Sequence, residues 1–591
     1  MRIPLQNKGQ YLNNDLILLL RRTAEHKKPE HTWAAKRFVN LVFVGAAVYI
    51  WLTTAILYIT AIVAALGSSA ANPKMPMEIE DFAVVGVSAG MFIMTSAVWH
   101  RVPEMLADFG HHLEDFVGRP VVIVQAICYA LVSDRFWYIR KAVGWLAVFG
   151  VFSLILWGVR ITAQFSPAIP HRFNAGTALS HFMTPEMLVF TFGVLVNATI
   201  SVLAIRFGFS RKWRVIFAKP KYDDAKEIKL ASNATVPAYR LVHASDLHIT
   251  ACERTGMIET GESISDESLR AVFGAIENDA MDCEAVLLTG DITDDGAAES
   301  WQRFLRFLPE SLRNKVILLP GNHDLNLQQG GAKKGNYVER CLNWLKLVVF
   351  LKAERLDSFG RRMRQIRAMC VMTELMGERA YLIDKRTKKL TKLKDYFESH
   401  SAAIHAHIAS SVGPRTAMNQ IWDDMFPMVV QSGNPEVGLI LLDSIKAASV
   451  NMTNAIGAMP SSAISTCESL MAETADKFEC FAIALHHHLA IPSGNNWRDR
   501  FKSAFLVFEN AIELVEMLTR RGEPSVVFHG HRHREYMGVV ENSEVSVIAT
   551  ASATVGSHGR VGHGSWRVVE LATDRGACRL NTLPSSRRVT P

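Results

Sequence analysis

Residues 240–324 decide the fold, because the motifs DLH (246–248), GDITD (290–294) and GNHD (321–324) each follow a short apolar run there. The three runs occupy residues 241–244, 285–289 and 316–319. Short apolar runs bounded by turn formers are typical of buried parallel strands. Helical spacing between the runs predicts a β-α-β-α-β unit. Polar residues follow the carboxyl end of each strand, and open α/β sheets have their binding and catalytic sites at this edge.

Two later apolar runs end in histidines. Residues 483–485 lead into HHH (486–488), and residues 526–528 lead into GHRH (530–533). If all five strand ends meet, they bring Asp, Asn and His side chains together. Such a mixed oxygen and nitrogen set suits divalent transition metals better than Ca²⁺ or a thiolate-bound structural zinc.

Length and composition limit the remaining possibilities. A chain of 591 residues is too long for one domain. Its 8 cysteines form no CxxC pair, which favours a reducing compartment over a disulfide framework. The net charge of +7 would suit an anionic membrane surface, but by itself it is no argument for nucleic-acid binding.

The first third of the chain contains four apolar runs without a charged residue, which we predict to be transmembrane helices. They occupy residues 41–66, 82–99, 142–159 and 187–205. The alternative is four buried core helices, but charge-free runs of this length are rare in soluble cores. Because the runs hold no charge, no ion path or proton relay is visible, and the region is expected to be an anchor.

The flanking charges predict the orientation. Arg and Lys residues precede residue 41, lie between the second and third runs, and follow residue 205, whereas the loop 68–81 is acidic. The positive-inside rule then places both ends, and the catalytic part, on the cytoplasmic side. The short apolar segment 120–132 is interpreted as interfacial or re-entrant; as a fifth span it would move the catalytic part outside.

The chain is therefore predicted to have an α-helical transmembrane region followed by an α/β domain. The expected divisions are a basic N-terminus (1–40), four spans (41–206), a basic linker (207–236), the α/β domain (237–584) with a helical insertion (331–433), and a disordered tail (585–591). Within the insertion, residues 352–394 carry thirteen Lys/Arg against five Asp/Glu. The plain interpretation is a solvated face, and the alternative is contact with anionic lipid or an anionic substrate.

The motifs also suggest which residue does what. Two divalent ions about 3.5–4 Å apart need a bridging carboxylate, and Asp291 is the natural bridge because its strand is the middle one. The first ion would take Asp246, His248 and His533, and the second would take Asn322, His486 and His531. In the histidine triplet His486 is favoured as the ligand because it comes first off the strand, with His487 as an alternative that supports a ligand or faces the substrate.

A hydroxide shared by the two ions would attack phosphorus in line, while the ions neutralise the phosphate oxygens. His323 would provide a proton or positive charge for the leaving alkoxide, and Asp324 would orient His323. Asp294 and Asp295 are expected to cap the next helix, with a place behind a metal ligand as the alternative for Asp294.

The motifs DLH, GDITD, GNHD, HHH and GHRH, in this order at strand ends, resemble the calcineurin-like metallophosphoesterase superfamily. The resemblance covers residues 237–583 apart from the insertion. It implies a β-sandwich flanked by helices, a dinuclear centre and phosphoester hydrolysis, and it supports the ligand assignments above. The triplet followed by Pro492 is most similar to the subgroup with cyclic-nucleotide phosphodiesterases, although Leu489 stands where that subgroup has proline.

We therefore expect a membrane-anchored phosphohydrolase that uses two divalent ions (Mn, Fe or Zn) to cleave a phosphodiester or phosphomonoester. A lipid-linked phosphoester or a cyclic nucleotide would be its substrate. One alternative is a ligand-binding or regulatory phosphoesterase-like domain of a membrane transporter or receptor. Another is a nuclease of the same superfamily, but the basic insertion lacks an aromatic stacking platform for nucleic acid.

Overall fold

In the computed structural model, the described part of the chain is almost entirely the region after residue 237. It comprises residues 238–257, 261–326, 358–409, 415–432, 437–445, 457–490, 510–556, 563–574 and 577–589, with the single positions 19, 20, 22, 23, 222, 223, 228, 230 and 508. Contact clustering groups residues 1–30, 126–133 and 214–591 as one compact unit and the remaining residues as a second. All elements below belong to the first unit.

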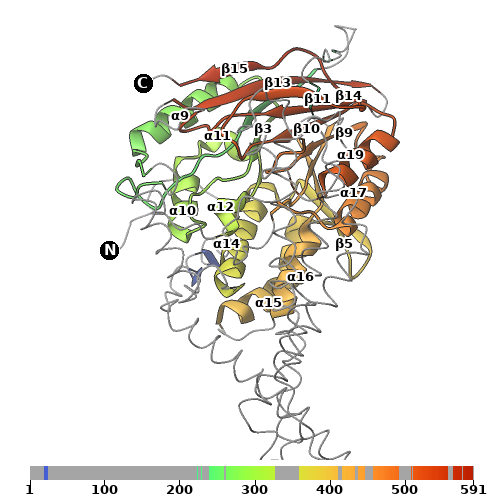
Figure 1. The fold of residues 1–591 in the computed structure, drawn as a ribbon. Coiled ribbons are helices and arrows are strands. Elements are labelled where there is room, and N and C mark those ends of the chain that lie inside the picture. The colour runs from blue at the N-terminus through green and yellow to red at the C-terminus, as the bar shows by residue number, and fades with distance from the viewer. Residues whose placement is uncertain are drawn as a thin grey trace, which may run out of the picture. The chain divides into compact units, whose positions relative to one another are not determined.

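The first sheet contains the β-α-β-α-β unit that the sequence predicts (Figure 1). Its strands, in spatial order, are β14 (Ala577–Leu580), β13 (Ser565–Asp574), β2 (Ala238–Ala244), β3 (Ala285–Thr289) and β4 (Val316–Leu319), with β15 (Ser585–Arg588) also paired to β13. β2 pairs with β3, and β3 with β4, in parallel, so the predicted unit is confirmed. β13 joins β2 antiparallel, which makes the sheet mixed.

The second sheet carries the histidine motifs. Its spatial order is β1 (Tyr222–Asp223), β11 (Tyr536–Val540), β12 (Val545–Ala549), β10 (Ser525–His529), β9 (Cys480–Ala484), β8 (Val437–Leu441), β7 (Met428–Gln431), β5 (Ala380–Asp384) and β6 (Lys389–Lys392). The four strands from β12 to β8 are parallel, and their neighbours on both sides are antiparallel. The parallel centre brings the ends of β9 and β10 to the same edge.

The two sheets share one hydrophobic core, and helices cover their outer faces (Figure 1). The helices are α9 (Asp266–Asp279), α10 (Ala298–Phe307), α11 (Glu310–Arg313), α12 (Asn322–Leu325), α14 (Ser358–Met376), α15 (Leu393–Ala409), α16 (Arg415–Met425), α17 (Ser461–Glu473) and α19 (Ala511–Arg520). Side chains alternate along a strand. Thus Ala482 and Ala484 of β9 face the core between the sheets, while Ile483 packs with Leu470 of α17 and Leu514 of α19.

Three expectations from the sequence differ from the structure. The predicted disordered tail contains β15, which pairs with β13 over Ser565–Val568. The insertion is not purely helical, because β7 pairs with β8 and so extends the second sheet. Strands as short as β5 and β7 span too few residues to establish an alternating pattern beside long helices. In the basic segment, Arg362 and Arg364 are buried and not part of a solvated face.

No helix in the described ranges combines the length and the apolar character needed to cross a bilayer. The four predicted spans, and the segment 120–132, lie outside those ranges.

The pairing of β15 gives a first prediction. A chain ending at Leu583 lacks β15, so the backbone amides of β13 that face it lose their hydrogen-bond partners. The amide of Ser565 donates to Ser552, so by alternation the amides of Trp566 and Val568 are those that face β15. We expect faster hydrogen–deuterium exchange at Trp566 and Val568 and unchanged exchange at residues 571–574, which pair with β14. Equal exchange at Trp566 and Val568 in the two chains would contradict this pairing.

Candidate metal centre

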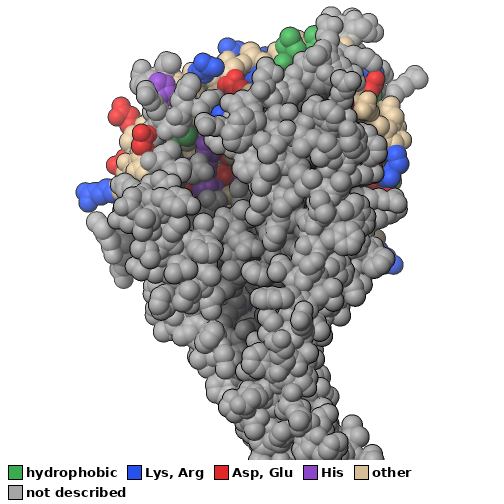
Figure 2. Space-filling model, viewed as in Figure 1, with side chains coloured by type: hydrophobic (Ala, Val, Ile, Leu, Met, Phe, Trp, Pro, Cys, Tyr) green, Lys and Arg blue, Asp and Glu red, His purple; other side chains and the backbone are tan. Residues whose placement is uncertain are grey.

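Every predicted ligand follows the carboxyl end of a strand in one of the two parallel regions. β2 leads to Asp246 and His248, β3 to Asp291, β4 to Asn322, β9 to His486, and β10 to His531 and His533. Because the two sheets are stacked, their carboxyl ends lie together, and the five turns face one another. Figure 2 shows histidine and acidic side chains side by side in a recess on one face of the molecule.

The backbone at these turns adopts a conformation that L-residues rarely take. Asp246, His248, Asp291, His531 and His533 have φ values of 55°, 47°, 51°, 76° and 51°. Only two other non-glycine residues of the described chain have a positive φ. The left-handed region costs a non-glycine residue about 1–3 kcal/mol, so such residues gather where function requires a particular side-chain direction. Here the conformation turns five polar side chains inward.

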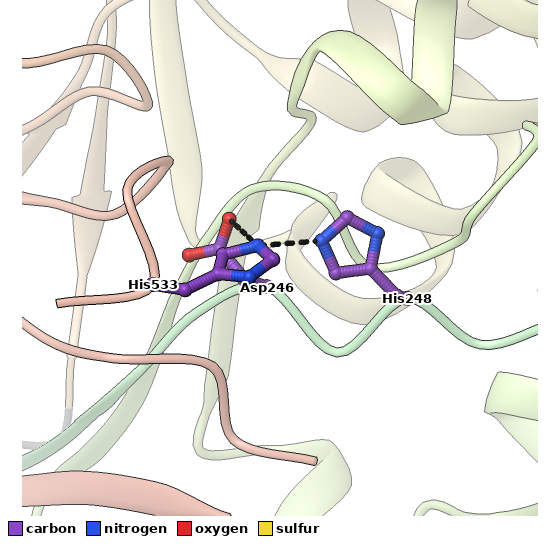
Figure 3. A group of neighbouring side chains, drawn as sticks. All are labelled: Asp246, His248 and His533. Carbon is purple, nitrogen blue, oxygen red and sulfur yellow. Dashed lines mark hydrogen bonds and ion pairs between the residues drawn. The ribbon is translucent and has the colours of Figure 1, made fainter. Parts of the chain in front are cut away.

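Asp246, His248 and His533 form the first group (Figure 3). The Nε2 atoms of His248 and His533 lie 3.0 Å apart, and Nε2 of His533 lies 3.5 Å from Oδ1 of Asp246. Asp246 is fully buried, and its carboxylate also accepts the backbone N–H of His531 at 3.0 Å. This last hydrogen bond connects the turn after β2 to the turn after β10.

Asn322, His486 and His531 form the second group. Nε2 of His486 lies 2.9 Å from Oδ1 of Asn322 and 3.1 Å from Nδ1 of His531. The ring of His486 is held from behind, because its Nδ1 lies 2.8 Å from the carbonyl oxygen of Thr289. That contact fixes which nitrogen of His486 faces the group.

Asp291 joins the two groups through a single atom. Its Oδ2 lies 3.3 Å from Nε2 of His486 in the second group and 3.9 Å from Nε2 of His248 in the first. The other oxygen, Oδ1, accepts the backbone N–H of His323 at 2.8 Å. The structure thus brings together all seven side chains predicted as ligands, with Asp291 between the two groups.

The donor atoms fit divalent cations. In each group two imidazole nitrogens face one another at 3.0–3.1 Å. Two neutral imidazoles that both present lone pairs repel at such a distance, whereas a cation near both nitrogens satisfies them. Carboxylate oxygen, amide oxygen and imidazole nitrogen together suit Mn²⁺, Fe or Zn²⁺.

Electrostatics support the same arrangement. Burial alone would raise the pKa of Asp291, but the positive potential of His486, His323 and His248 holds this pKa well below its ordinary value. Burial opposes a charge on His486 too, yet the carboxylate of Asp291 raises the pKa of His486 to about 9. The site therefore keeps Asp291 ionised, the state in which it binds a cation, and a cation bound at His486 would replace the proton that Asp291 stabilises on that ring.

Two glycines allow the turns to approach this closely. A Cβ at Gly530 would overlap Oγ of Ser245 and the carboxylate of Asp246, and a Cβ at Gly321 would overlap the carboxylate of Asp291. Each glycine directly precedes a ligand of its own turn, so the backbone of one turn lies against the ligand of another. Any larger residue at these positions would push the turns apart.

The prediction that Asp324 orients His323 is wrong. The carboxylate of Asp324 accepts backbone N–H groups of Ile292, Thr293 and Gly321 at 2.7–3.0 Å, and so ties the turn after β3 to the turn after β4. The residue beside His323 is Asp294, whose Oδ1 lies 3.3 Å from Nδ1 of His323.

Asp294 also contacts a predicted ligand, since the same Oδ1 lies 3.1 Å from Nδ1 of His248. It therefore does not cap helix α10. That helix is preceded by Asp295, whose Oδ1 accepts the N–H of Ala297 at 2.9 Å and the hydroxyl of Ser300 at 2.7 Å. The sequence predicted that both aspartates cap the helix, with a place behind a ligand as the alternative for Asp294, and the contacts of Asp294 agree with that alternative. The available signal was that one helix start needs only one such residue.

The other histidines near the site occupy supporting positions. His487 lies behind His486, with its Nδ1 2.9 Å from Oγ of Ser444. His488 packs against His529, with ring centroids 4.3 Å apart. His243 on β2 contacts the hydroxyl of Thr289 through Nε2 at 2.9 Å, so it is the strand residue that the sequence suggests.

A comparison of the sequence with known families finds the family that the motifs resemble. Residues 239–411 match the family described as calcineurin-like phosphoesterase. A 3′,5′-cyclic-nucleotide phosphodiesterase of Nostoc sp. is 34% identical over 84 residues, which is 14% of this chain and 30% of that protein. The match thus spans less than a third of that relative.

Among solved structures, a purple acid phosphatase from yellow lupin (Lupinus luteus) seeds is similar with a TM-score of 0.32 at 12% identity, over 60% of this chain and 52% of that one. A calcineurin-like phosphoesterase of Bacillus subtilis gives a TM-score of 0.26 at 9% identity, over 60% and 90%. These TM-scores are too low to bear on the fold. The family match over residues 239–411 and the order of the motifs both indicate a calcineurin-like phosphoesterase domain within this chain.

Proposed function

We propose that this protein is a metal-dependent phosphoester hydrolase with a dinuclear centre. The observation that carries the proposal is the pair of ligand groups joined by Oδ2 of Asp291, which lies within 4 Å of an imidazole nitrogen in each. A structural zinc site would need one closed set of four ligands, whereas this arrangement offers two sets that share a carboxylate.

In this proposal, Asp246, His248 and His533 hold one divalent ion, and Asn322, His486 and His531 hold the other. When bound, the ions activate a water molecule as the nucleophile and neutralise the phosphoryl oxygens. The chain itself supplies the geometry of the ligands, four of which are buried, while His531 and His533 are half-buried.

His323 is the proposed proton donor to the leaving oxygen. Its Nδ1 lies beside the carboxylate and the carbonyl oxygen of Asp294, at 3.3 Å and 3.1 Å. Two acceptors at Nδ1 favour a proton on that nitrogen and stabilise the doubly protonated ring. Nε2 is then the nitrogen that would give its proton to the leaving group.

For the substrate we favour a phosphodiester, and a cyclic nucleotide first. Support comes from the Nostoc relative, whose name states this activity, and from the histidine triplet followed by Pro492. A lipid-linked phosphoester is the alternative and would suit a membrane-anchored enzyme. A screen of both classes with Mn²⁺ would distinguish them.

We also propose that four apolar helices anchor the protein, with the catalytic domain on the cytoplasmic side. One contact supports a common side for both ends of the apolar region. Leu19 and Leu20 are buried in the core of the catalytic domain, and Arg367 donates to the carbonyl oxygen of Thr23 at 3.0 Å. Residue 23 precedes the apolar region and Arg367 follows it, so this contact supports an even number of crossings.

The orientation can be tested on Cys252, which is exposed. A membrane-impermeant maleimide should label it in inside-out vesicles and fail to label it in right-side-out vesicles. The part of the signal that belongs to Cys252 should be absent in Cys252→Ser, which serves as the baseline. Labelling of Cys252 in right-side-out vesicles would place the catalytic domain outside.

Hydrolysis itself is tested with two substitutions. Asp291→Ala removes the shared carboxylate, so we expect loss of bound metal and of all hydrolysis of an aryl phosphate ester. His323→Ala should keep the metal and lower kcat by about 10²–10⁴-fold, the usual contribution of a general acid. Metal content, kcat and thermal midpoint are measured together.

The matched controls are Asp282→Ala and His405→Ala, because both residues are exposed on the surface. They should behave as the unaltered protein does. Full activity in both site variants, or purified protein without metal, would remove the hydrolase proposal and favour a ligand-binding domain.

Asp294 gives a sharper comparison because its neighbour is chemically identical. Asp294→Asn weakens the contacts to His248 and His323, and we expect a loss of about 10–100-fold in metal affinity or kcat, as for other residues that support a ligand. Asp295→Asn should change neither, since Asp295 contacts only the start of helix α10. The reverse result would show that the two roles are exchanged.

A further inference from the structure

Helix α14 of the insertion carries three arginines at intervals of three, Arg361, Arg364 and Arg367, here called the arginine row. Residues spaced by three lie on the same side of a helix. Arg364 is buried, and Arg361 and Arg367 are half-buried. A row of cations on a buried helix face is costly unless each one meets hydrogen-bond acceptors.

The acceptors come from the turns that hold the predicted ligands. Arg364 donates from Nε to the carbonyl oxygen of Leu325 at 2.8 Å, and Arg361 donates to the side-chain oxygen of Asn326. Leu325 and Asn326 directly follow the GNHD motif, and Leu325 ends helix α12, where the last carbonyl groups of a helix have no partner within the helix. The insertion thus supplies the donors that this turn lacks.

Arg367 reaches the other turn. Its Nη1 donates to the carbonyl oxygen of Gly296 at 3.1 Å, two residues after Asp294. The stem of Arg364 also lies against Gly296, so closely that a Cβ at Gly296 would overlap it. The same Cβ would overlap the carbonyl oxygen of Asp324, so the two turns and the helix meet at one point.

We propose that the arginine row positions the metal centre: helix α14 holds the GDITD and GNHD turns in the geometry that brings Asp291, Asn322 and His323 together. The inference rests on the proposed metal centre and extends it to residues far outside the five motifs. Guanidinium groups suit this role because their donors have a fixed planar geometry, which a lysine ammonium lacks. The arginines are positioning residues, since none is among the groups proposed to bind metal.

The neighbouring Arg362 provides a matched control. It is as buried as Arg364 and lies on the same helix, but its Nε is 3.2 Å from Nε2 of His407 on helix α15. This contact lies within the insertion. Arg362→Lys should therefore reduce stability without affecting the GDITD and GNHD turns.

The experiment compares Arg364→Lys, Arg367→Lys and Arg362→Lys in the full-length protein. Three quantities are measured: the Kd for Mn²⁺ by titration calorimetry, the amide hydrogen exchange of residues 291–296 and 321–326 in the metal-free protein, and the thermal midpoint. For Arg364→Lys and Arg367→Lys we expect Kd to rise by about 10–100-fold, the range for residues that support metal ligands, with faster exchange in both segments. Arg362→Lys should lower the thermal midpoint alone.

If Arg364→Lys does not fold, the half-buried Arg367→Lys carries the comparison. Unchanged Kd and exchange in the foldable variants of the row would overturn the proposal, and so would an equal effect of Arg362→Lys. If the unaltered protein binds no Mn²⁺, the metal centre itself is refuted. The exchange data then still decide whether the row holds the turns.

Discussion

The structure depends on one constraint: five polar residues must keep a left-handed backbone while their side chains meet in a buried place. Each such residue costs about 1–3 kcal/mol, and all five follow strands of the two parallel regions. A strained turn persists only when its surroundings determine it fully. Here those surroundings are the strands before each turn, the hydrogen bonds between turns, and the glycines that admit close approach.

Hydrogen bonds connect the turns to one another. The carboxylate of Asp324 accepts N–H groups from the turn after β3, and Asp246 accepts the N–H of His531 from the turn after β10. Thr289, at the end of β3, contacts His486 after β9. Each of the two carboxylates thus fixes the backbone of another turn, and the carbonyl group of Thr289 fixes the ring of His486. Such mutual support holds reactive groups in place without metal.

The insertion also stabilises the turns of the site. Three arginines of α14 contact the turns after β3 and β4 of the first sheet, and β7 extends the second sheet. The chain segment between the GNHD motif and β8 therefore contacts two turns of the first sheet and adds a strand to the second sheet. Arg367 additionally contacts Thr23, which comes before the apolar region, so the N-terminal segment meets the same helix.

The sequence by itself determined the strand–turn–strand order, the parallel unit of β2, β3 and β4, and the seven side chains that gather at the strand ends. These follow from local patterns: short apolar runs, helical spacing and polar residues after strands. Only the tertiary structure decided which hydrogen-bond acceptor pairs with which donor. Asp294 and Asp295 are adjacent and identical, and only the approach of His248 and His323 separates their roles. Likewise, the sequence of helix α14 does not show whether its arginines face solvent or donate to carbonyl groups. Those carbonyl groups belong to residues 296 and 325, which are distant from α14 in the sequence.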